Sequence, residues 1–268
     1  MIGLSFSVRL CKNKVSALIR GISPDKTHHS KVQRIKTMAN TPINTIAVIP
    51  ARGDSKRLPG KALLPFNDKP MIAITIEAAI ASNCFSKIVV SSDNDTILGV
   101  ASEYGATPYK RDASLSDDKT PTAPVLLDIL ESEESQGQYW DVLACLYATA
   151  PLRTATDIEN VMSLIEPGTC DFAMAVCECE RPIHQALLED VDGVLRPVWP
   201  ESVGINSQEV GRYLFGNGST YAVTVSAFLE TKSLYGPGLR GYEMPLSRSV
   251  DLNTTDDLNR LNLFATSE

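Results

Sequence analysis

Short apolar runs and helical patterns alternate along residues 45–178, and this alternation restricts the fold more than any other feature of the sequence. The apolar runs predict buried strands, and the segments between them have the spacing and end signals of helices. A repeated strand–helix order is typical of a parallel sheet covered by helices on both faces. We therefore expect an α/β fold with a doubly wound, mostly parallel sheet. The expected strands are 45–50, 87–93, 141–149 and 171–178, and the expected helices are 71–83, 96–105, 121–134 and 154–166.

The alternation breaks after the fourth expected strand. Residues 180–215 contain prolines, short polar strands and no helical period, which indicates a small inserted arm that leaves the sheet. Such an arm can cover a substrate or exchange with a second subunit. STYAVTVSAF (219–228) then predicts a strand and a helix. In SVDLNTTDDL, Asp251 is expected to end a last strand, before a helix whose first turn carries Asp256 and Asp257.

The first 37 residues differ in composition from the rest of the chain. The 25 Lys and Arg and the 32 Asp and Glu residues give a net charge of −7. Eight of the basic residues but a single acid, Asp25, lie in residues 1–37, so the remainder has a net charge of −14. This leader is either an organellar targeting segment or precedes a natural start at Met38, and we expect it to be disordered. Residues 38–268 then form a single domain, whose acidic character argues against nucleic-acid binding.

Cysteine, histidine and hydropathy exclude several classes of protein. None of the six cysteines forms a CxxC pair, and Cys145 lies in an apolar run, so we expect reduced thiols in a cytoplasmic protein. Only His184 lies outside the leader, which argues against a His-rich zinc site or a Ser-His-Asp triad. No apolar run approaches the roughly 18 residues that span a bilayer, so we expect no association with a membrane.

Four cations follow the first expected strand, in IAVIPARGDSKRLPGK (46–61). In open α/β sheets, ligands bind outside the carboxyl ends of the strands, which is where this loop begins. Gly53 would let backbone N–H groups approach a ligand, and Arg52, Lys56 and Lys61 can face phosphate oxygens. The spacing is neither that of GxxxxGK[ST] nor that of GxGxxG. Because the remainder of the chain is acidic, these cations favour phosphate binding over a merely solvated basic loop.

Three other strand ends carry candidate groups. Asp251 could hold a Mg²⁺ that bridges a triphosphate, since Mg²⁺ takes one or two protein oxygens together with phosphates and waters. VSSDNDT (90–96) offers hydroxyls and acids for a base or ribose, although Asp95 could instead cap the next helix. LYATAPLRT (146–154) lies at the end of the central strand, which favours a substrate role, although Thr154 could also cap a helix.

Together, these segments resemble the acylneuraminate cytidylyltransferases, which activate nine-carbon acidic sugars with CTP. The resemblance covers most of residues 45–264. It rests on segments that occur in the family's order: IAVIPARGDSKRLPGK, KPMIAITIEAA, IVVSSDND, LYATAPLRT, NGSTYAV and SVDLNTTDDL. It implies a Rossmann-like nucleotidyltransferase fold, CTP and an acidic sugar as ligands, Mg²⁺ or Mn²⁺ as cofactor, and a homodimer. RLPGK is also similar to the related enzyme for the eight-carbon sugar of lipopolysaccharide.

The resemblance also implies roles for individual residues. Arg52 and Lys61 would act on the CTP phosphates as catalytic residues. The nucleotide-binding residues would be Ala51, Gly53, Ser55, Lys56, Arg111 and Thr122. The substrate-binding residues would be Tyr147, Gln185, Gln208 and Arg212. The metal would be held by Asp251 and Asn253.

Two departures from the family's pattern concern the metal and the central strand. Asn253 stands in place of a second metal aspartate, and its amide oxygen can ligate Mg²⁺ but adds no charge. Tyr147 stands where sialic acid enzymes carry glutamine in LLQPTSPLR, and it resembles the IYxTAP run of the pseudaminic acid branch. PIHQALL (182–188) is similar to a PIQ-like stretch of the same branch.

Two further departures lie in the arm. Asn206 and Phe215 replace arginines that would suit a sugar carboxylate, and Arg212 or Arg181 could substitute for them. The resemblance thus favours transfer of CMP from CTP to a pseudaminic acid-like sugar. The alternative sugars are N-acetylneuraminate or legionaminate, and then 3-deoxy-manno-octulosonate. A different alternative is a nucleotide-sugar binding protein without turnover, which the replaced arginines and Asn253 would fit.

Overall fold

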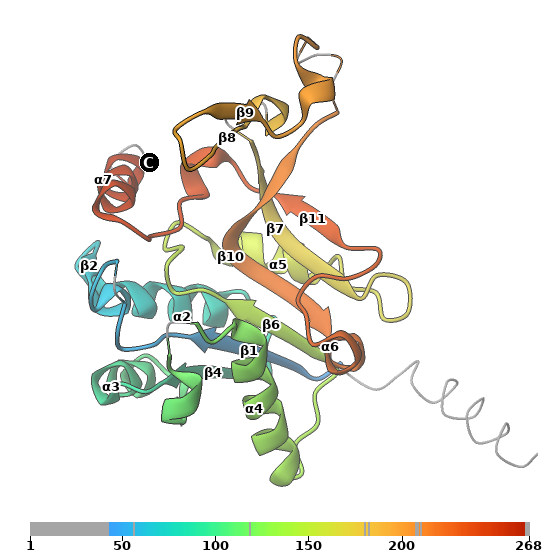
Figure 1. The fold of residues 1–268 in the computed structure, drawn as a ribbon. Helices are drawn as coiled ribbons and strands as arrows, with labels where there is room; N and C mark the ends of the chain where they lie inside the picture. The colour runs from blue at the N-terminus through green and yellow to red at the C-terminus, as the bar shows by residue number, and fades with distance from the viewer. Residues whose placement is uncertain are drawn as a thin grey trace, which may run out of the picture. The chain divides into compact units, whose positions relative to one another are not determined.

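The computed structural model describes residues 43–265, with the exception of Lys56, Asp118, Glu180, Pro182, Ser207, Gln208 and Val210. The expected leader, residues 1–37, therefore lies outside the described residues. The described chain forms a seven-stranded sheet with helices on both faces (Figure 1). None of the described helices has the length and the apolar character of a membrane span.

Four parallel strands form one half of the sheet. β1 (Thr45–Pro50) lies between β4 (Lys87–Ser92) and β6 (Val142–Leu146) and pairs with both in parallel. β5 (Thr107–Lys110) pairs in parallel with β4 on the other side. The chain thus moves outward from β1 to β5 and then returns to the opposite side of β1. This reversal leaves a crevice at the carboxyl ends of β1 and β6, where ligands bind in open α/β sheets.

The other half of the sheet is mixed. β10 (Leu214–Thr224) runs antiparallel to both β6 and β7 (Phe172–Glu178). β11 (Arg240–Glu243) adds a parallel edge strand to β7. Four of the six strand pairs are therefore parallel, which confirms the expected doubly wound, mostly parallel α/β sheet.

Five helices cover the two faces at the places that the sequence predicts. One face carries α2 (Met71–Ala81), α3 (Asp95–Glu103) and α5 (Ala155–Met162), and the other carries α4 (Thr122–Ser135) and α6 (Val225–Thr231) (Figure 1).

The side chains of β1 show why this strand is central. Ile46 and Val48 pack in the core beneath α4 and α6, whereas Ala47 and Ile49 pack in the core beneath α2, α3 and α5. Successive side chains of a strand point to opposite faces, so a strand covered on both faces must be apolar throughout. The residues that follow β1 are therefore fixed by two cores at once.

The structure corrects the expectation that Asp251 ends a strand. Residues 249–254 are irregular, between a short 3₁₀ turn (Leu246–Arg248) and α7 (Thr255–Ala265). Val250 and Leu252 are buried in a separate small core and not in the sheet. Their alternating apolar pattern has the period of a strand because every second side chain packs inward.

The segment after β7 leaves the main sheet, as shown at the top of Figure 1. It contains a two-stranded hairpin of β8 (Leu187–Glu189) and β9 (Leu195–Pro197), which pairs only with itself among the described strands. From here on, the arm means residues 183–205, which lie within the expected 180–215. The chain re-enters the main sheet at Leu214, which pairs with Glu178 of β7.

A buried ion pair fastens α4 to the sheet and generates a prediction. The Lys87 Nζ lies 2.7 Å from Oε1 of Glu133, whose side chain is only 6% exposed. We expect Lys87→Met to lower the free energy of unfolding by about 2–3 kcal/mol, because it leaves a buried carboxylate unpaired. The double variant Lys87→Met, Glu133→Leu should recover part of this loss in urea unfolding at pH 7. A double variant less stable than Lys87→Met alone would contradict the assignment.

Candidate functional site

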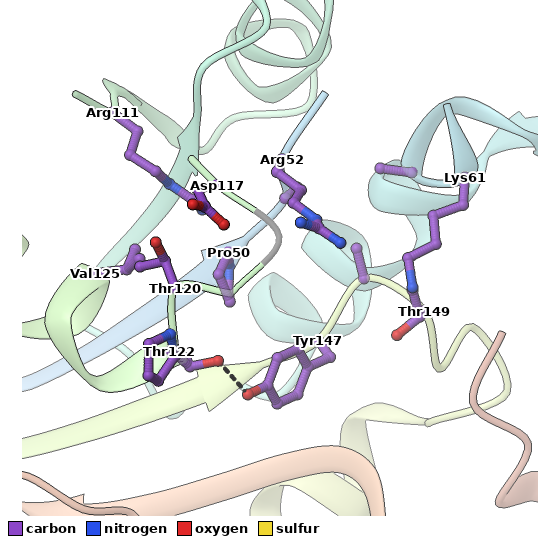
Figure 2. A pocket seen from close by; sticks show the side chains of 14 residues that line it. Pro50, Arg52, Lys61, Arg111, Asp117, Thr120, Thr122, Val125, Tyr147 and Thr149 are labelled. Atoms are coloured by element: carbon purple, nitrogen blue, oxygen red, sulfur yellow. Dashed lines mark hydrogen bonds between the residues drawn. The ribbon is translucent and has the colours of Figure 1, made fainter. Parts of the chain in front are cut away.

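A cavity of about 230 Å³ opens at the carboxyl ends of β1 and β6 (Figure 2). It lies in the crevice that the strand order creates, and its walls come from segments that are far apart in the sequence. The lining residues are Pro50, Ala51, Arg52, Lys61, Ala62, Arg111, Asp117, Thr120, Pro121, Thr122, Val125, Tyr147, Ala148 and Thr149. Of the residues predicted to bind nucleotide or sugar, or to be catalytic, Ala51, Arg52, Lys61, Arg111, Thr122 and Tyr147 are among them.

The loop after β1 is held against the end of β4. The Ala51 N–H donates to the Ser91 carbonyl at 2.9 Å, and the Gly53 N–H donates to Oδ1 of Asp93 at 2.8 Å. A Cβ atom at Gly53 would lie only 2.7 Å from the Cβ of Asn94, so this approach requires glycine. Ser55, in the same loop, is buried. Lys56, which was also predicted to contact phosphate, lies outside the described residues.

Arg111 is a buried cation in the cavity wall. Its Nε and Nη2 donate to the hydroxyl and the carbonyl of Ser91, at 3.1 and 2.8 Å. Burial lowers the pKa of Arg111, the charge of Asp93 opposes this shift, and the charge of Arg52 adds to it. An arginine nevertheless stays protonated in a protein. Two guanidinium groups thus lie near one cavity, which suits an anionic ligand.

Lys61 joins the cavity to the segment before α7. Its Nζ donates to the Leu252 carbonyl at 3.1 Å and to Oδ1 of Asn253 at 3.4 Å. Burial lowers the pKa of Lys61, whereas the charge of Asp251 raises it. In Figure 2 the side chains of Arg52, Arg111 and Lys61 come from three different segments, with Arg52 in the middle of the view.

Asp251 offers an oxygen that fits a Mg²⁺ ion shared with phosphates. Its Oδ2 accepts a hydrogen bond from Nδ2 of Asn253 at 2.7 Å, and within the described residues its Oδ1 has no hydrogen-bond partner. Gly218, with φ +71°, leaves room for the carboxylate, because a Cβ there would lie 3.2 Å from Cγ of Asp251. No three His, Cys, Asp or Glu side chains gather as a possible metal centre among the described residues. An ion at Asp251 would therefore need further oxygens from its ligand.

Tyr147 and Thr122 form the polar floor of the cavity. Their hydroxyl oxygens are 2.6 Å apart, as the dashed line in Figure 2 marks. The Tyr147 ring packs edge-on against Tyr221, with centroids 5.8 Å apart. Burial raises the pKa of Tyr147, so the phenol stays neutral. The buried Arg153 donates to the carbonyls of Tyr147 and Ser219, at 3.3 and 2.6 Å, and so fixes the end of β6 against β10.

Two predicted substrate residues are not brought to this cavity, and a third cannot be placed. Arg212 forms an ion pair with Glu243 at the end of β11. Its Nη2 also lies 3.8 Å from Oε2 of Glu178 at the end of β7. Gln185 lies in the arm, beside a separate cavity of about 450 Å³. Gln208 lies outside the described residues.

Several lining residues were not predicted from the sequence. Asp117 and Thr120 lie in the loop before α4, and Thr149 ends the turn after β6. Asp117 lies only six residues after the predicted Arg111, in the run YKRDASLSDD (109–118). The expected helix caps are partly correct, since Thr154 caps α5 but Asn94 and not Asp95 caps α3.

A buried ion pair positions the segment that carries Asp251. Asp157 of α5 accepts hydrogen bonds from both terminal nitrogens of Arg248, of which the Nη2 to Oδ1 distance is 3.1 Å, and one from the Tyr242 hydroxyl at 3.3 Å. The same carboxylate closes the capping box with Thr154. Because Arg248 lies three residues before Asp251, this pair ties the irregular segment to the helix after β6.

Comparisons with known proteins agree on one family. The family model described as Cytidylyltransferase matches residues 46–191. A pseudaminic acid cytidylyltransferase of Campylobacter jejuni (strain 81-176) is 33% identical over 217 residues, 81% of this chain and 94% of that protein. The CMP-N,N'-diacetyllegionaminic acid synthase of Legionella pneumophila is 32% identical over 215 residues, 79% of this chain and 92% of that protein.

A solved structure supports the fold. CMP:2-keto-3-deoxy-manno-octonic acid synthetase complexed with CTP superposes with a TM-score of 0.62, over 84% of this chain and 99% of that one. Its sequence identity is 17%, so this likeness shows the fold alone. It confirms the expected Rossmann-like nucleotidyltransferase fold.

The Asp157–Arg248 pair predicts a pH-dependent loss of stability. Burial alone would raise the pKa of Asp157, but hydrogen bonds from Arg248 and Thr154 outweigh it and lower that pKa. A lowered pKa stabilises the fold above the unfolded value of about 4, and this contribution is lost as pH falls through the folded value. We expect Asp157→Asn to cost about 2–4 kcal/mol of unfolding free energy at pH 7.

The measurement is urea unfolding at pH 7 and at more acidic pH values, with the exposed Asp256→Asn as control. The difference between wild type and Asp157→Asn should shrink below about pH 4, as the wild-type carboxylate becomes protonated. A difference that does not change with pH would contradict the assignment of the ion pair.

Proposed function

The chain belongs to the cytidylyltransferase family, and on this premise we propose that it transfers CMP from CTP to the anomeric hydroxyl of a nine-carbon acidic sugar. Pyrophosphate is the second product. The family resemblance found in the sequence is confirmed by the matching family model and by relatives at 32–33% identity. The single observation that carries the proposal is the cavity at the ends of β1 and β6, which three cations line. A triphosphate is the ligand that needs such a charge in an otherwise acidic chain.

The cations supply the electrostatic part of the mechanism. As the sugar hydroxyl attacks the α-phosphorus, the bond to the leaving pyrophosphate breaks and negative charge grows on the phosphate oxygens. Arg52 and Lys61 would stabilise this charge on the β- and γ-phosphates, and Arg111 would bind the nucleotide. Fixed cations in a partly buried site act strongly because they need little reorganisation during the reaction.

Asp251 is the residue that would hold a Mg²⁺ or Mn²⁺ ion. When bound there, the ion would supply positive charge to the phosphate groups and make the attacking hydroxyl more acidic. Tyr147 is not the proton acceptor, because burial raises its pKa. Thr122 and Tyr147 would instead orient the reactants, Thr122 at the cytosine and Tyr147 at the sugar. Orientation of this kind supplies much of the catalysis in phosphoryl transfer.

The sugar that we propose is pseudaminic acid or a close relative. Two observations support this choice: the similarity to proteins of that name, and Tyr147 at the end of β6. Legionaminic acid and N-acetylneuraminic acid are the alternatives, because relatives named for these sugars are 32% and 30% identical.

The proposal extends to a homodimer that forms through the arm. Large apolar side chains of the hairpin are exposed in one chain, including Leu187 and Leu195 at 55% and 56%. The imidazole of His184 is buried, yet neither ring nitrogen has a hydrogen-bond partner among the residues that the structure describes. A second copy of the chain would cover this apolar surface.

Arg52→Ala provides the test of the proposed chemistry. It is expected to lower pyrophosphate release from CTP and sugar by about 10²–10³-fold or more, because a fixed cation is lost where charge develops. Circular dichroism should show a folded protein. Arg240→Ala, which removes a half-exposed cation from β11, should turn over normally.

The same assay identifies the sugar, with pseudaminic, legionaminic, N-acetylneuraminic and 3-deoxy-manno-octulosonic acids offered in parallel. Pseudaminic acid is expected to give the highest kcat/KM. The proposal would be refuted if wild type released no pyrophosphate with any of these sugars, or if Arg52→Ala turned over at a near-normal rate.

The proposed interface predicts that two negative charges introduced into the arm will prevent dimer formation. Leu187 and Leu195 lie on the same face of the hairpin, since Leu187 pairs with Pro197 and Leu195 with Glu189. We expect Leu187→Asp with Leu195→Asp to convert a dimer to a monomer in light scattering. Ile80→Asp, at an exposed apolar position of α2, should remain dimeric. A wild-type monomer at micromolar concentration, or a dimeric double variant, would refute this interface.

A further inference from the structure

Asn253 has contacts at both ends of its amide. Its Oδ1 accepts a hydrogen bond from Nη2 of Arg57 at 2.8 Å and one from Nζ of Lys61 at 3.4 Å. Its Nδ2 donates to Oδ2 of Asp251 at 2.7 Å. The oxygen that could ligate a metal thus already faces two cations.

We propose that Asn253 is a positioning residue that joins the Arg57 and Lys61 cations to the Asp251 carboxylate, and that it is not a metal ligand. The divalent cation then enters as a complex with the triphosphate, and Asp251 is its one protein ligand from this segment. The inference rests on the proposed function, because it concerns the same nucleotide.

The local charge disfavours a divalent cation without a nucleotide. Three cations, Lys61, Arg57 and Arg52, lie near this segment, of which Lys61 and Arg57 contact Asn253, and two carboxylates, Asp251 and Asp257, lie close to Lys61. The carboxylate of Asp257 is engaged elsewhere, because its Oδ2 accepts from the N–H groups of Asn253 and Thr254 at 2.9 and 2.8 Å. A nucleotide triphosphate reverses this balance by adding several negative charges and the oxygens that Mg²⁺ prefers.

An amide suits this position better than a carboxylate would. An aspartate at 253 could accept from Arg57 and Lys61 but could not donate to Asp251, and two carboxylates at hydrogen-bonding distance repel each other. The amide donates to one oxygen of Asp251 and leaves Oδ1 without a partner among the described residues. That oxygen is then held in place for an incoming cation.

The first test measures CTP binding by calorimetry in the presence of EDTA. Asn253→Leu is expected to weaken this metal-free binding about tenfold or more, because Arg57, Lys61 and Asp251 lose their shared hydrogen-bond partner. If Asn253 served only as a metal ligand, its substitution would not change CTP binding in EDTA. Unchanged metal-free binding by Asn253→Leu would therefore overturn the proposal.

The second test measures Mn²⁺ binding by electron paramagnetic resonance, without and with CTP. Wild type is expected to bind Mn²⁺ only with CTP. Asn253→Asp adds a second carboxylate. Without nucleotide, it should therefore bind Mn²⁺ at least about tenfold more tightly than wild type does under the same conditions. Asn259→Asp, which adds the same charge at an exposed position of α7, should behave as wild type.

Two results would contradict the inference in different ways. The nucleotide-free wild type could bind Mn²⁺ as tightly as Asn253→Asp does. This result would overturn the role proposed for Asn253 but leave the proposed function intact. Failure of wild type to bind CTP, with and without metal, would refute the proposed function and this inference with it.

Discussion

The backbone of Leu252 is the point at which the walls of the site meet. Its N–H donates to the Thr149 carbonyl at 2.8 Å, and its carbonyl accepts from Lys61 at 3.1 Å. Its side chain is fully buried in the small core that contains Phe66 and Leu261. One residue thus joins the turn after β6, the loop after β1 and the segment before α7. This junction helps to hold the Asp251 carboxylate beside the cations of the cavity.

Local signals in the sequence predict the sheet and the cation loop because both depend on nearby residues. TIAVIP forms a strand from Thr45 to Pro50, and the loop that follows it begins at the edge that parallel pairing creates. Arg111 and Tyr147 directly follow strands β5 and β6, and Thr122 begins α4, which packs on the same sheet, so the strand order and the packing of α4 bring them to one cavity.

The sequence does not predict contacts that depend on distant parts of the chain. Asn253 and Arg57 are 196 residues apart, and their hydrogen bond arises from the small core around Leu252. The strand expected at Asp251 is wrong for the same reason, because burial in a local cluster imitates the period of a strand. Arg212 was expected to face a sugar carboxylate, yet acids of β7 and β11 lie beside it. A residue's partners, and not only its type, decide what charge it can offer a ligand.

A crystal structure with Mg²⁺ and a non-reactive analogue of CTP tests the central claim most directly. The account predicts the β- and γ-phosphates against Arg52 and Lys61, the cytosine beside Thr122, and a cation that bridges the phosphates to Asp251 while Asn253 keeps its contact with Arg57. Phosphates bound away from the end of β1, or a cation ligated by Asn253 with Arg57 displaced, would contradict it.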